Sequence, residues 1–340
     1  MSFITNIRSV AKYESKILVR SWFFRIFTLL AVVFLGFFNF AMMLMEDNFG
    51  LWFAKSVSSN IPYLNLLLLN TGQAVVAVFL SSEFLKRDKK LDTSEVFYVR
   101  PLSNAEYVVG KIWGNLRVFL FLNLLVLAIV LAFNFMASGV AVDLPAYLVY
   151  FFLISIPTLI FIIGLSIFLM LLLKNQALTF ILLLGYIGLT LFYIQDKFYY
   201  LFDYMVYNLP LFKSTIVGFS NLELILNHRA IYFFAGLGFI FFTIFLFKRL
   251  PNARRSHYPW LFLSFCMFLL MGTAGFRHVR SILREGEMRA LYTSINNKYV
   301  YEPKMAIDYY DISVEQKSET IRSVVGMEGT ALAASEGFIF

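Results

Sequence analysis

The sequence has little charge and almost no cysteine. Only 15% of its 340 residues are Asp, Glu, Lys or Arg, whereas 60% are hydrophobic and 19% are aromatic. A soluble domain of this length needs a more polar exterior, so these proportions exclude one and indicate a membrane protein with several spans. The one cysteine, Cys266, lies in an apolar run and excludes an intrachain disulfide framework.

Motifs of the common catalytic sites are also missing. The sequence has no glycine-rich phosphate loop of the Walker type, no His-Glu-x-x-His zinc pair and no Gly-x-Ser-x-Gly nucleophile elbow. No expected span carries the paired carboxylates of a proton relay. We therefore predict that this chain has no catalytic residue and binds no cofactor.

The histidines and basic residues do not indicate a metal or nucleic-acid site. His228, His257 and His278 are far apart and lie at the ends of apolar runs, which favours interfacial histidines over metal ligands. The net charge of +8 is explained by loops between spans, as is usual in membrane proteins. No basic patch then remains for nucleic acid.

Long apolar runs predict seven membrane-spanning helices. They cover residues 22–45, 61–84, 112–135, 146–173, 177–195, 230–247 and 259–276. Pro157 removes one backbone donor inside the fourth span, so we expect a kink there. Asn65, Asn70 and Gln73 lie inside the second span, where their amides favour hydrogen bonds between helices over a substrate site.

Residues 1–21 predict an amphipathic helix and not a signal peptide. Basic residues are spread through this segment, and the apolar run that follows is longer than that of a signal peptide. The apolar residues fall near one face at helical spacing, and the basic ones take the other. The apolar set is Ile4, Ile7, Val10, Ile17 and Leu18, and the basic set is Arg8, Lys12, Lys16 and Arg20. We expect this helix in the cytoplasmic headgroup region, with its cations toward anionic lipid.

Loop charges predict the orientation. Most Lys and Arg residues of the loops fall in alternate segments, namely 1–21, 85–111, 174–176 and 248–258. The intervening loops hold only Lys55, Lys197, Lys213 and Arg229. The positive-inside rule therefore places the N-terminus in the cytoplasm and residues 277–340 outside it.

The loop Glu83–Lys111, between the second and third spans, is the most polar piece of the first two hundred residues. After a dense charged cluster, Asp92–Glu95 resembles a helix start with an acidic first turn. Arg100-Pro101 ends that helix, and Ser103 can cap the next one with Glu106 three residues on. Composition alone fits either a docking surface or a solvated loop that only fixes topology.

Residues 196–229 form a second unusual stretch, too polar to span a membrane and too aromatic for a solvated loop. We expect two short helices that dip into the outer interface and are broken at Asn208–Pro210. The alternative is an ordinary loop surrounded by an aromatic belt.

The tail, residues 277–340, differs from the rest. Arg277–Ala290 predicts a charged helix leaving the membrane, and Ala306–Val314 and Thr320–Val325 predict strands. So short a segment does not easily close a β domain. We expect an extracytoplasmic tail that is an incomplete β domain and either pairs with a partner or belongs to a longer protein.

The run Arg100–Lys111, RPLSNAEYVVGK, is similar to the P-[LV]-S-x-x-x-[YF]-x-x-[GA]-K run that leads into the third span of ABC-2-type (type V) ABC exporter permease subunits. The order of interfacial helix, six spans, structured inner loop and aromatic segment also resembles that family, over about residues 1–250. The resemblance implies an all-α polytopic membrane protein with a six-helix permease bundle at residues 22–250. The seventh span and partly β tail are additions that resemble those of larger Bacteroidota membrane proteins.

The resemblance also implies a function. The chain would be a transport subunit, not an enzyme, that exports an amphipathic lipid, drug or glycan across a bacterial inner membrane. A separate ABC ATPase subunit would bind ATP and Mg, and the permease would form a homodimer or a heterodimer with a similar subunit in the lipid bilayer. No nucleic-acid partner is expected. The alternative is a membrane anchor or scaffold that presents an extracytoplasmic domain.

Two sets of site residues follow from the resemblance. The ATPase-coupling loop comprises Glu83, Lys86, Arg87, Asp88, Leu91, Asp92, Thr93, Glu95, Val96, Pro101, Ser103, Glu106, Tyr107, Gly110 and Lys111. The outer gate comprises Tyr199, Tyr200, Tyr204, Tyr207, Pro210 and Phe212.

Overall fold

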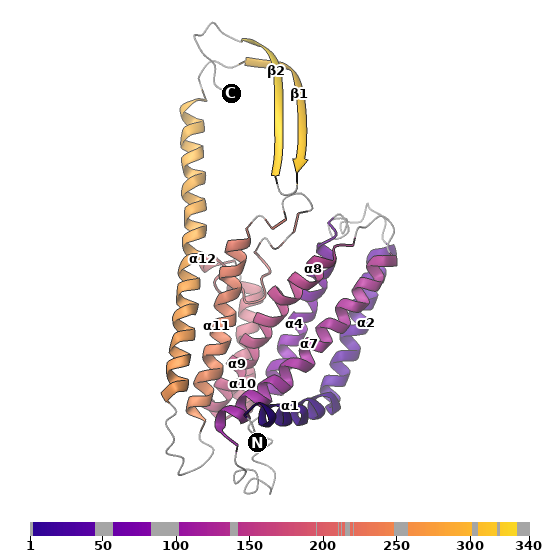
Figure 1. The fold of residues 1–340 in the computed structure, drawn as a ribbon, viewed down its shortest axis with the longest axis vertical. Coiled ribbons are helices and arrows are strands. Elements are labelled where there is room, and N and C mark those ends of the chain that lie inside the picture. Colours follow the sequence, from indigo (N-terminus) through magenta and orange to yellow (C-terminus); the bar gives the residue numbers. More distant parts are fainter. Residues whose placement is uncertain are drawn as a thin grey trace. The chain divides into compact units, whose positions relative to one another are not determined.

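The protein is an all-α polytopic membrane protein with a small two-stranded sheet (Figure 1). Its computed structural model describes residues 3–44, 57–82, 102–136, 142–194, 196–209, 211, 213–214, 218–219, 221–247, 258–300, 305–317 and 320–331. Seven helices among these are long and apolar enough to cross a membrane. The chain divides into two units, the first Met1–Phe212 with Asn221–Arg277 and the second Lys213–Ser220 with His278–Phe340.

The elements follow the predicted order. The helices are α1 (Phe3–Arg20), α2 (Trp22–Leu44), α4 (Asn60–Ser82), α7 (Asn104–Met136), α8 (Leu144–Tyr150), α9 (Ile156–Leu173), α10 (Gln176–Leu189), α11 (Leu222–Leu246) and α12 (Tyr258–Lys298). Short π-helical turns η1 (Phe151–Ser155) and η2 (Thr190–Ile194) and the 3₁₀ turn η3 (Phe198–Tyr200) interrupt them. The strands are β1 (Met305–Lys317) and β2 (Thr320–Ala331).

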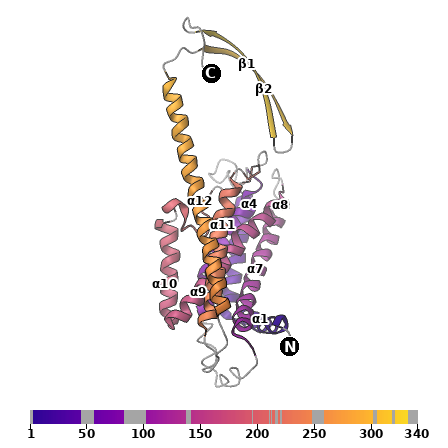
Figure 2. The same ribbon diagram turned by 60° about the vertical axis from the view of Figure 1, so that its left-hand side comes forward.

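Helices α4 and α9 form the centre of the first unit. In the most apolar 18 residues of each span that contains α4 or α9, 61% of the residues are buried. The corresponding shares are 17% in α2 and 22% in the span that contains α10. Figure 2 shows α10 at the edge of the bundle. The low burial of the peripheral helices means that they turn their apolar side chains toward lipid. At the centre, α9 and α11 approach closely at two glycines: a Cβ on Gly164 would lie only 2.6 Å from the carbonyl oxygen of Gly236.

The structure shows a change of helix type next to Pro157, where a kink is predicted. The fourth span is not one regular helix, because the π-helical turn η1 separates α8 from α9 immediately before Pro157. Proline has no N–H to donate to the carbonyl four residues earlier, that of Leu153. A π-helical turn at such a position is a common way to accommodate the missing bond.

The amides inside the second span bond to neighbouring helices, as predicted. Asn65 and Asn39 of α2 exchange hydrogen bonds of 2.7 and 3.1 Å. Asn70 donates to Asn123 of α7 at 3.2 Å, and Asn123 donates to Gln73 at 2.9 Å. These bonds tie α4 to helices on two sides.

The sixth span begins earlier than predicted. It was expected at 230–247, but α11 runs from Leu222 to Leu246 and so contains His228 and Arg229. These two side chains are 0% and 2% exposed. The assignment of Arg229 to an outer loop was therefore wrong.

The second unit contains the predicted strands. The segments expected at 306–314 and 320–325 are confirmed as β1 and β2, an antiparallel pair in which Ile312 lies opposite Val325. The charged helix expected at 277–290 is also present, but it is not separate. It continues the helix of the seventh span, so that α12 runs unbroken for 41 residues.

Candidate functional site

Five residues of the expected coupling loop lie at the start of α7. Ser103 precedes the helix, and Glu106, Tyr107, Gly110 and Lys111 occupy its first two turns. The other expected members, which lie outside the described residues, are Glu83, Lys86, Arg87, Asp88, Leu91, Asp92, Thr93, Glu95, Val96 and Pro101. Of the described five, Glu106, Gly110 and Lys111 contact α1.

A capping box starts α7. The backbone N–H of Ser103 donates to Glu106 Oε2 at 2.6 Å, and the backbone N–H of Glu106 donates to Ser103 Oγ at 3.2 Å. The predicted cap is therefore confirmed. Glu106 Oε1 also accepts a hydrogen bond of 2.9 Å from Asn6 Nδ2 of α1. The cap thus attaches α7 to α1 as well as starting the helix.

Two glycines let α1 and α7 approach closely. A Cβ on Gly110 would lie 2.7 Å from the Cβ of Val10, and a Cβ on Gly114 would lie 2.8 Å from the carbonyl oxygen of Ala11. Small residues four apart are typical of close helix packing in membranes. Gly114 in particular faces backbone, which cannot move aside as a flexible side chain can.

A buried ion pair joins the same two helices. Lys111 Nζ lies 3.1 Å from Glu14 Oε1, and the two side chains are only 2% and 5% exposed. The ammonium also lies 5.0 Å from the ring centroid of Tyr107. An unpaired charge at this depth would be costly, so the two charges depend on each other. We call the α1–α7 contact the inner joint; it consists of Asn6, Val10, Ala11 and Glu14 of α1 with Glu106, Gly110, Lys111 and Gly114 of α7.

The start of α7 also contacts the end of α11. Asn104 Nδ2 donates to the carbonyl oxygen of Phe247 at 2.6 Å, and the ring of Tyr107 stacks on that of Phe247 at 5.5 Å. Glu106, Tyr107 and Lys111 are therefore buried in contacts within the chain. A surface for another protein at this end must be built from other residues.

The stretch between α10 and α11 does not contain the two expected short helices within its described residues. Residues 196–209 form tight turns around η3 instead. Phe198, Tyr199 and Tyr200 have φ values of 52°, 59° and 62°. This left-handed conformation is costly for residues with a Cβ and stops a right-handed helix. We call residues 196–211 the re-entrant segment, of which 196–209 and 211 are described.

Side chains of α4, α8, α9 and α11 hold the re-entrant segment by its backbone carbonyls. The donor and acceptor residues are Tyr63 with Val206, Tyr150 with Leu211, Thr158 with Tyr204, His228 with Tyr200, Arg229 with Tyr204 and Tyr232 with Leu201. These bonds satisfy carbonyls that have no helix or sheet to pair with. They also explain why an unfavourable backbone conformation persists.

The segment reaches deep into the bundle. Tyr207 shares a hydrogen bond with Thr71, and Thr71 also donates to Met205 Sδ at 3.4 Å. Thr71 lies midway along α4. Non-helical backbone is tolerated at such depth only where protein buries it or where it lines a cavity.

Arg229 connects this segment to the irregular turn before Pro157. Its Nε donates to the carbonyl of Leu153 at 2.6 Å, and one terminal nitrogen donates to Ile154 at 3.3 Å. The other donates to Tyr204 of the re-entrant segment at 2.8 Å. The carbonyl of Leu153 is the one to which Pro157, having no N–H, cannot donate a hydrogen bond. Arg229 therefore replaces the missing helix donor and binds the segment to the α8–α9 span.

Asp203 is the buried acid of the segment. It is fully buried, and its Oδ2 accepts the backbone N–H of Asn208 at 2.8 Å. Burial raises the pKa of this carboxyl, while the bond from Asn208 and the charge of Arg229 oppose that rise. The carboxyl thus fixes the turn that follows it.

The expected gate residues do not share one surface. Tyr204 is fully buried and packs on Tyr186 and Tyr232, whereas Tyr199 is 45% exposed. Tyr200 and Tyr207 take part in the bonds described above. Pro210 and Phe212 lie outside the described residues.

Sequence reasoning missed the donors that hold the segment, above all Arg229. A usable signal was present. The run Leu222–Leu226 before His228 contains neither proline nor glycine, so the helix could have been extended backward through it.

No family model matches the sequence, and no curated protein matches it. The described residues also contain no cluster of three His, Cys, Asp or Glu side chains that could hold a metal ion. What is established is the class of protein: a multi-pass membrane protein whose apolar helices have the bilayer as their environment.

Proposed function

We propose that the chain is the membrane-spanning permease subunit of an ABC exporter and moves an amphipathic substrate with a separate ATPase subunit. The observation that carries the proposal is the re-entrant segment between the fifth and sixth spans. A purely structural bundle has no need of strained, non-helical backbone held to the depth of Thr71. A gate that moves to open and close a path for substrate does need such a segment.

Helix α4 connects the charged loop directly to the re-entrant segment. It contacts the re-entrant segment through Tyr63 and Thr71 and leads at its other end into the charged loop that begins at Glu83. ATP-driven closure of an ATPase dimer would push on this loop at Lys86–Val96, which lies outside the described residues. A rigid helix transmits such a push along its axis, and the segment would move as α4 shifts.

The inner joint would hold α7 in place while α4 moves. α7 follows the same loop, and its first turns are fixed to α1 by the Glu14–Lys111 pair and to α11 by Asn104. A push on the loop would then move α4 against a held α7. The amide contacts between α4 and α7, such as Asn70–Asn123, are where the two helices would slide.

A second candidate, a membrane anchor that presents the tail to other proteins, is favoured by the hairpin. Pairing of Ile312 with Val325 and of Tyr310 with Met327 gathers apolar side chains on one face, all more than 40% exposed. Isolated two-stranded hairpins are marginal in water and gain stability from a covering surface. In this case the spans would serve only as a scaffold.

Co-purification from native membranes tests the proposal. The tagged full-length chain is extracted in mild detergent, and the bound proteins are identified by peptide mass spectrometry. We expect an ATP-binding subunit that is lost when Lys86, Arg87, Asp92 and Glu95 are changed to alanine. The matched control changes two basic and two acidic residues of α12, Arg280, Arg284, Glu285 and Glu287, to alanine and retains the subunit.

Three results would overturn the exporter proposal. One is a preparation that retains no nucleotide-binding protein, and another is equal loss of that protein in both variants. The third is recovery only of envelope proteins that depend on residues 277–340, which would establish the anchor instead.

A further inference from the structure

Helix α4, helix α7 and the turn η1 share a buried polar cluster. We call it the amide cluster; it consists of Asn70 and Gln73 of α4, Asn123 of α7 and Ser155 of η1, and none of the four is more than 1% exposed. Asn70 Nδ2 donates to Asn123 Oδ1 and to Ser155 Oγ, each at 3.2 Å. Ser155 Oγ donates to Asn123 Oδ1 at 2.8 Å, and Asn123 Nδ2 donates to Gln73 Oε1 at 2.9 Å. The bonds therefore form a chain that begins at Asn70 and ends at Gln73.

Each end of this chain has an atom without a partner. Asn70 Oδ1, an acceptor, and Gln73 Nε2, a donor, are buried and accept or donate no hydrogen bond within the described part of the chain. The amides cannot be turned to remove these free atoms. Asn70 Nδ2 also donates to the carbonyl of Leu66, and Asn123 Nδ2 to that of Phe119, each at 2.8 Å. A turned amide would place oxygen against oxygen at these carbonyls.

Burial alone does not force free atoms on amides in this bundle. Asn39 and Asn65 are also buried, and they exchange hydrogen bonds with each other. Their amide nitrogens donate in addition to the carbonyls of Leu35 and Ile61. Every amide nitrogen and oxygen of that pair has a partner, whereas the amide cluster keeps one free donor and one free acceptor.

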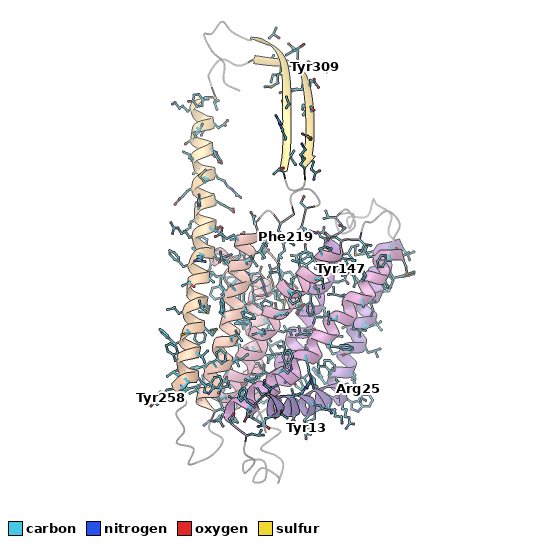
Figure 3. The ribbon with its side chains drawn as sticks, in the orientation of Figure 1. Tyr13, Arg25, Tyr147, Phe219, Tyr258 and Tyr309 are labelled. Atoms are coloured by element: carbon cyan, nitrogen blue, oxygen red, sulfur yellow. The ribbon has the colours of Figure 1, made fainter. Side chains whose placement is uncertain are left out.

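The amide cluster lies midway through the bundle. On α7, Asn123 stands between Lys111, which is paired with α1, and Asn134, which donates to the hydroxyl of Tyr147 at 3.1 Å. Figure 3 shows Tyr147 at one end of the first unit and Tyr13 of α1 at the other. Bulk water at either end is therefore distant, and free polar atoms at this depth are costly.

The two free atoms are suited to one small neutral molecule. Residues three apart on a helix have Cβ atoms about 5–6 Å apart, which a single molecule with two hydrogen bonds can bridge. A cation would meet the donor hydrogens of Gln73, and an anion would meet the oxygen of Asn70. A headgroup or a larger ligand would need an opening, but both side chains are almost wholly covered. Water donates and accepts, and it is small enough to be enclosed.

We propose that the amide cluster binds one water molecule, which accepts a hydrogen bond from Gln73 Nε2 and donates one to Asn70 Oδ1. The water closes a ring in which Asn70 donates to Asn123, Asn123 to Gln73, Gln73 to water and water to Asn70. All four donate in the same direction around the ring, so the bonds strengthen one another. A water can also reorient where packed side chains cannot, so the link between α4 and α7 persists when these helices shift slightly. This inference does not depend on the proposed transport function.

A crystal structure of the full-length chain, grown in a lipidic cubic phase and at a resolution that shows ordered water, tests the proposal. We expect a separate density peak within hydrogen-bonding distance of both Asn70 Oδ1 and Gln73 Nε2. Absence of that peak overturns the proposal, as does a direct bond between the two amides or a peak in contact with only one of them. This measurement on the wild type needs no substitution to be decisive.

A pair of variants tests the role of Gln73 in the same crystals. Gln73→Met removes the free donor at similar side-chain length, and we expect it to lose the peak while the bonds between Asn123 and Ser155 remain. The matched control is Asn65→Leu, which breaks the fully paired amides on the same helix and should keep the peak. Circular dichroism checks that both variants fold. A peak that survives Gln73→Met, or one lost equally in both variants, contradicts the assignment of the water to this pair.

Discussion

The inner joint and the re-entrant segment both bury polar groups away from water, but they satisfy those groups in different ways. The inner joint uses regular helices, small residues and a paired charge, as at Gly114 and Lys111. The re-entrant segment has irregular backbone, and its carbonyls accept hydrogen bonds from individual side chains of the surrounding helices, such as Arg229 and Tyr150.

This difference has energetic consequences. In the inner joint the side chains satisfy each other, so both partners can be replaced together by apolar residues. In the re-entrant segment the acceptors are backbone atoms that no substitution removes. Loss of a donor there leaves buried carbonyls without partners, which costs more than the bond itself contributes. Three predictions test whether the two regions differ in this way.

The largest effect is expected for Arg229→Met. This change removes the guanidinium that donates to the carbonyls of Leu153 and Ile154 and leaves the Tyr204 carbonyl with Thr158 as its other donor. We expect the free energy of unfolding to fall by about 3–5 kcal/mol. Denaturation of the purified protein in detergent measures it. Arg229→Lys should give an intermediate loss, because an ammonium cannot reach all the acceptors of a guanidinium. The exposed control Arg284→Met should change stability by less than about 0.5 kcal/mol. A loss as small as the control's would show that Arg229 does not hold the segment.

A smaller effect is expected at the inner joint. Lys111→Met leaves Glu14 buried without its partner and should cost about 3 kcal/mol in the same assay. The double variant Glu14→Leu/Lys111→Met should recover most of that loss, because a buried ion pair can often be replaced by apolar side chains. A double variant no more stable than Lys111→Met would contradict the comparison, since the joint would then be no more replaceable than the segment.

The smallest effect is expected from the protonation of Asp203. Burial raises the pKa of this carboxyl above its ordinary value of 3.8, so the folded protein binds its proton more tightly than the unfolded chain does. The contribution of Asp203 to stability is therefore greatest at acidic pH and is lost as the pH rises through the raised pKa. Asp203→Asn keeps an acceptor for the N–H of Asn208 and removes this dependence.

Denaturation of wild type and Asp203→Asn across the acidic to neutral range checks the sign. The variant should gain in stability relative to the wild type as the pH rises, because other titrating groups cancel in the difference. A difference that stays flat across this range would show that the pKa of Asp203 is not raised in the folded state.

Local signals accounted for what was predicted correctly. The capping box of Ser103 and Glu106 and the strands of the hairpin each depend on residues close in sequence. The amides of Asn65 and Asn70 were expected to bond between helices, because little else in a membrane can satisfy them. These features needed no knowledge of which helices are neighbours.

Distant contacts account for the errors. The aromatic stretch after Asp196 looked helical because nothing local shows that its carbonyls meet Tyr63, Thr158 and Tyr232 from other spans. Arg229 looked like a loop cation because its acceptors lie on a different helix. In α1, apolar Ile4 is exposed while Glu14 is buried, since Lys111 of α7 supplies its partner.

The sequence by itself determined the class of the protein, the number and order of the spans and the ends of several helices. Those properties follow from the hydrophobicity of long runs and from hydrogen bonds within a few residues. Only the tertiary structure decided that an arginine inside α11 replaces the backbone donor lost at Pro157 and holds a non-helical segment among the spans. The reason is physical, because in a medium without water each freed carbonyl needs a donor, and only the packing of distant helices decides which side chain is close enough to supply it.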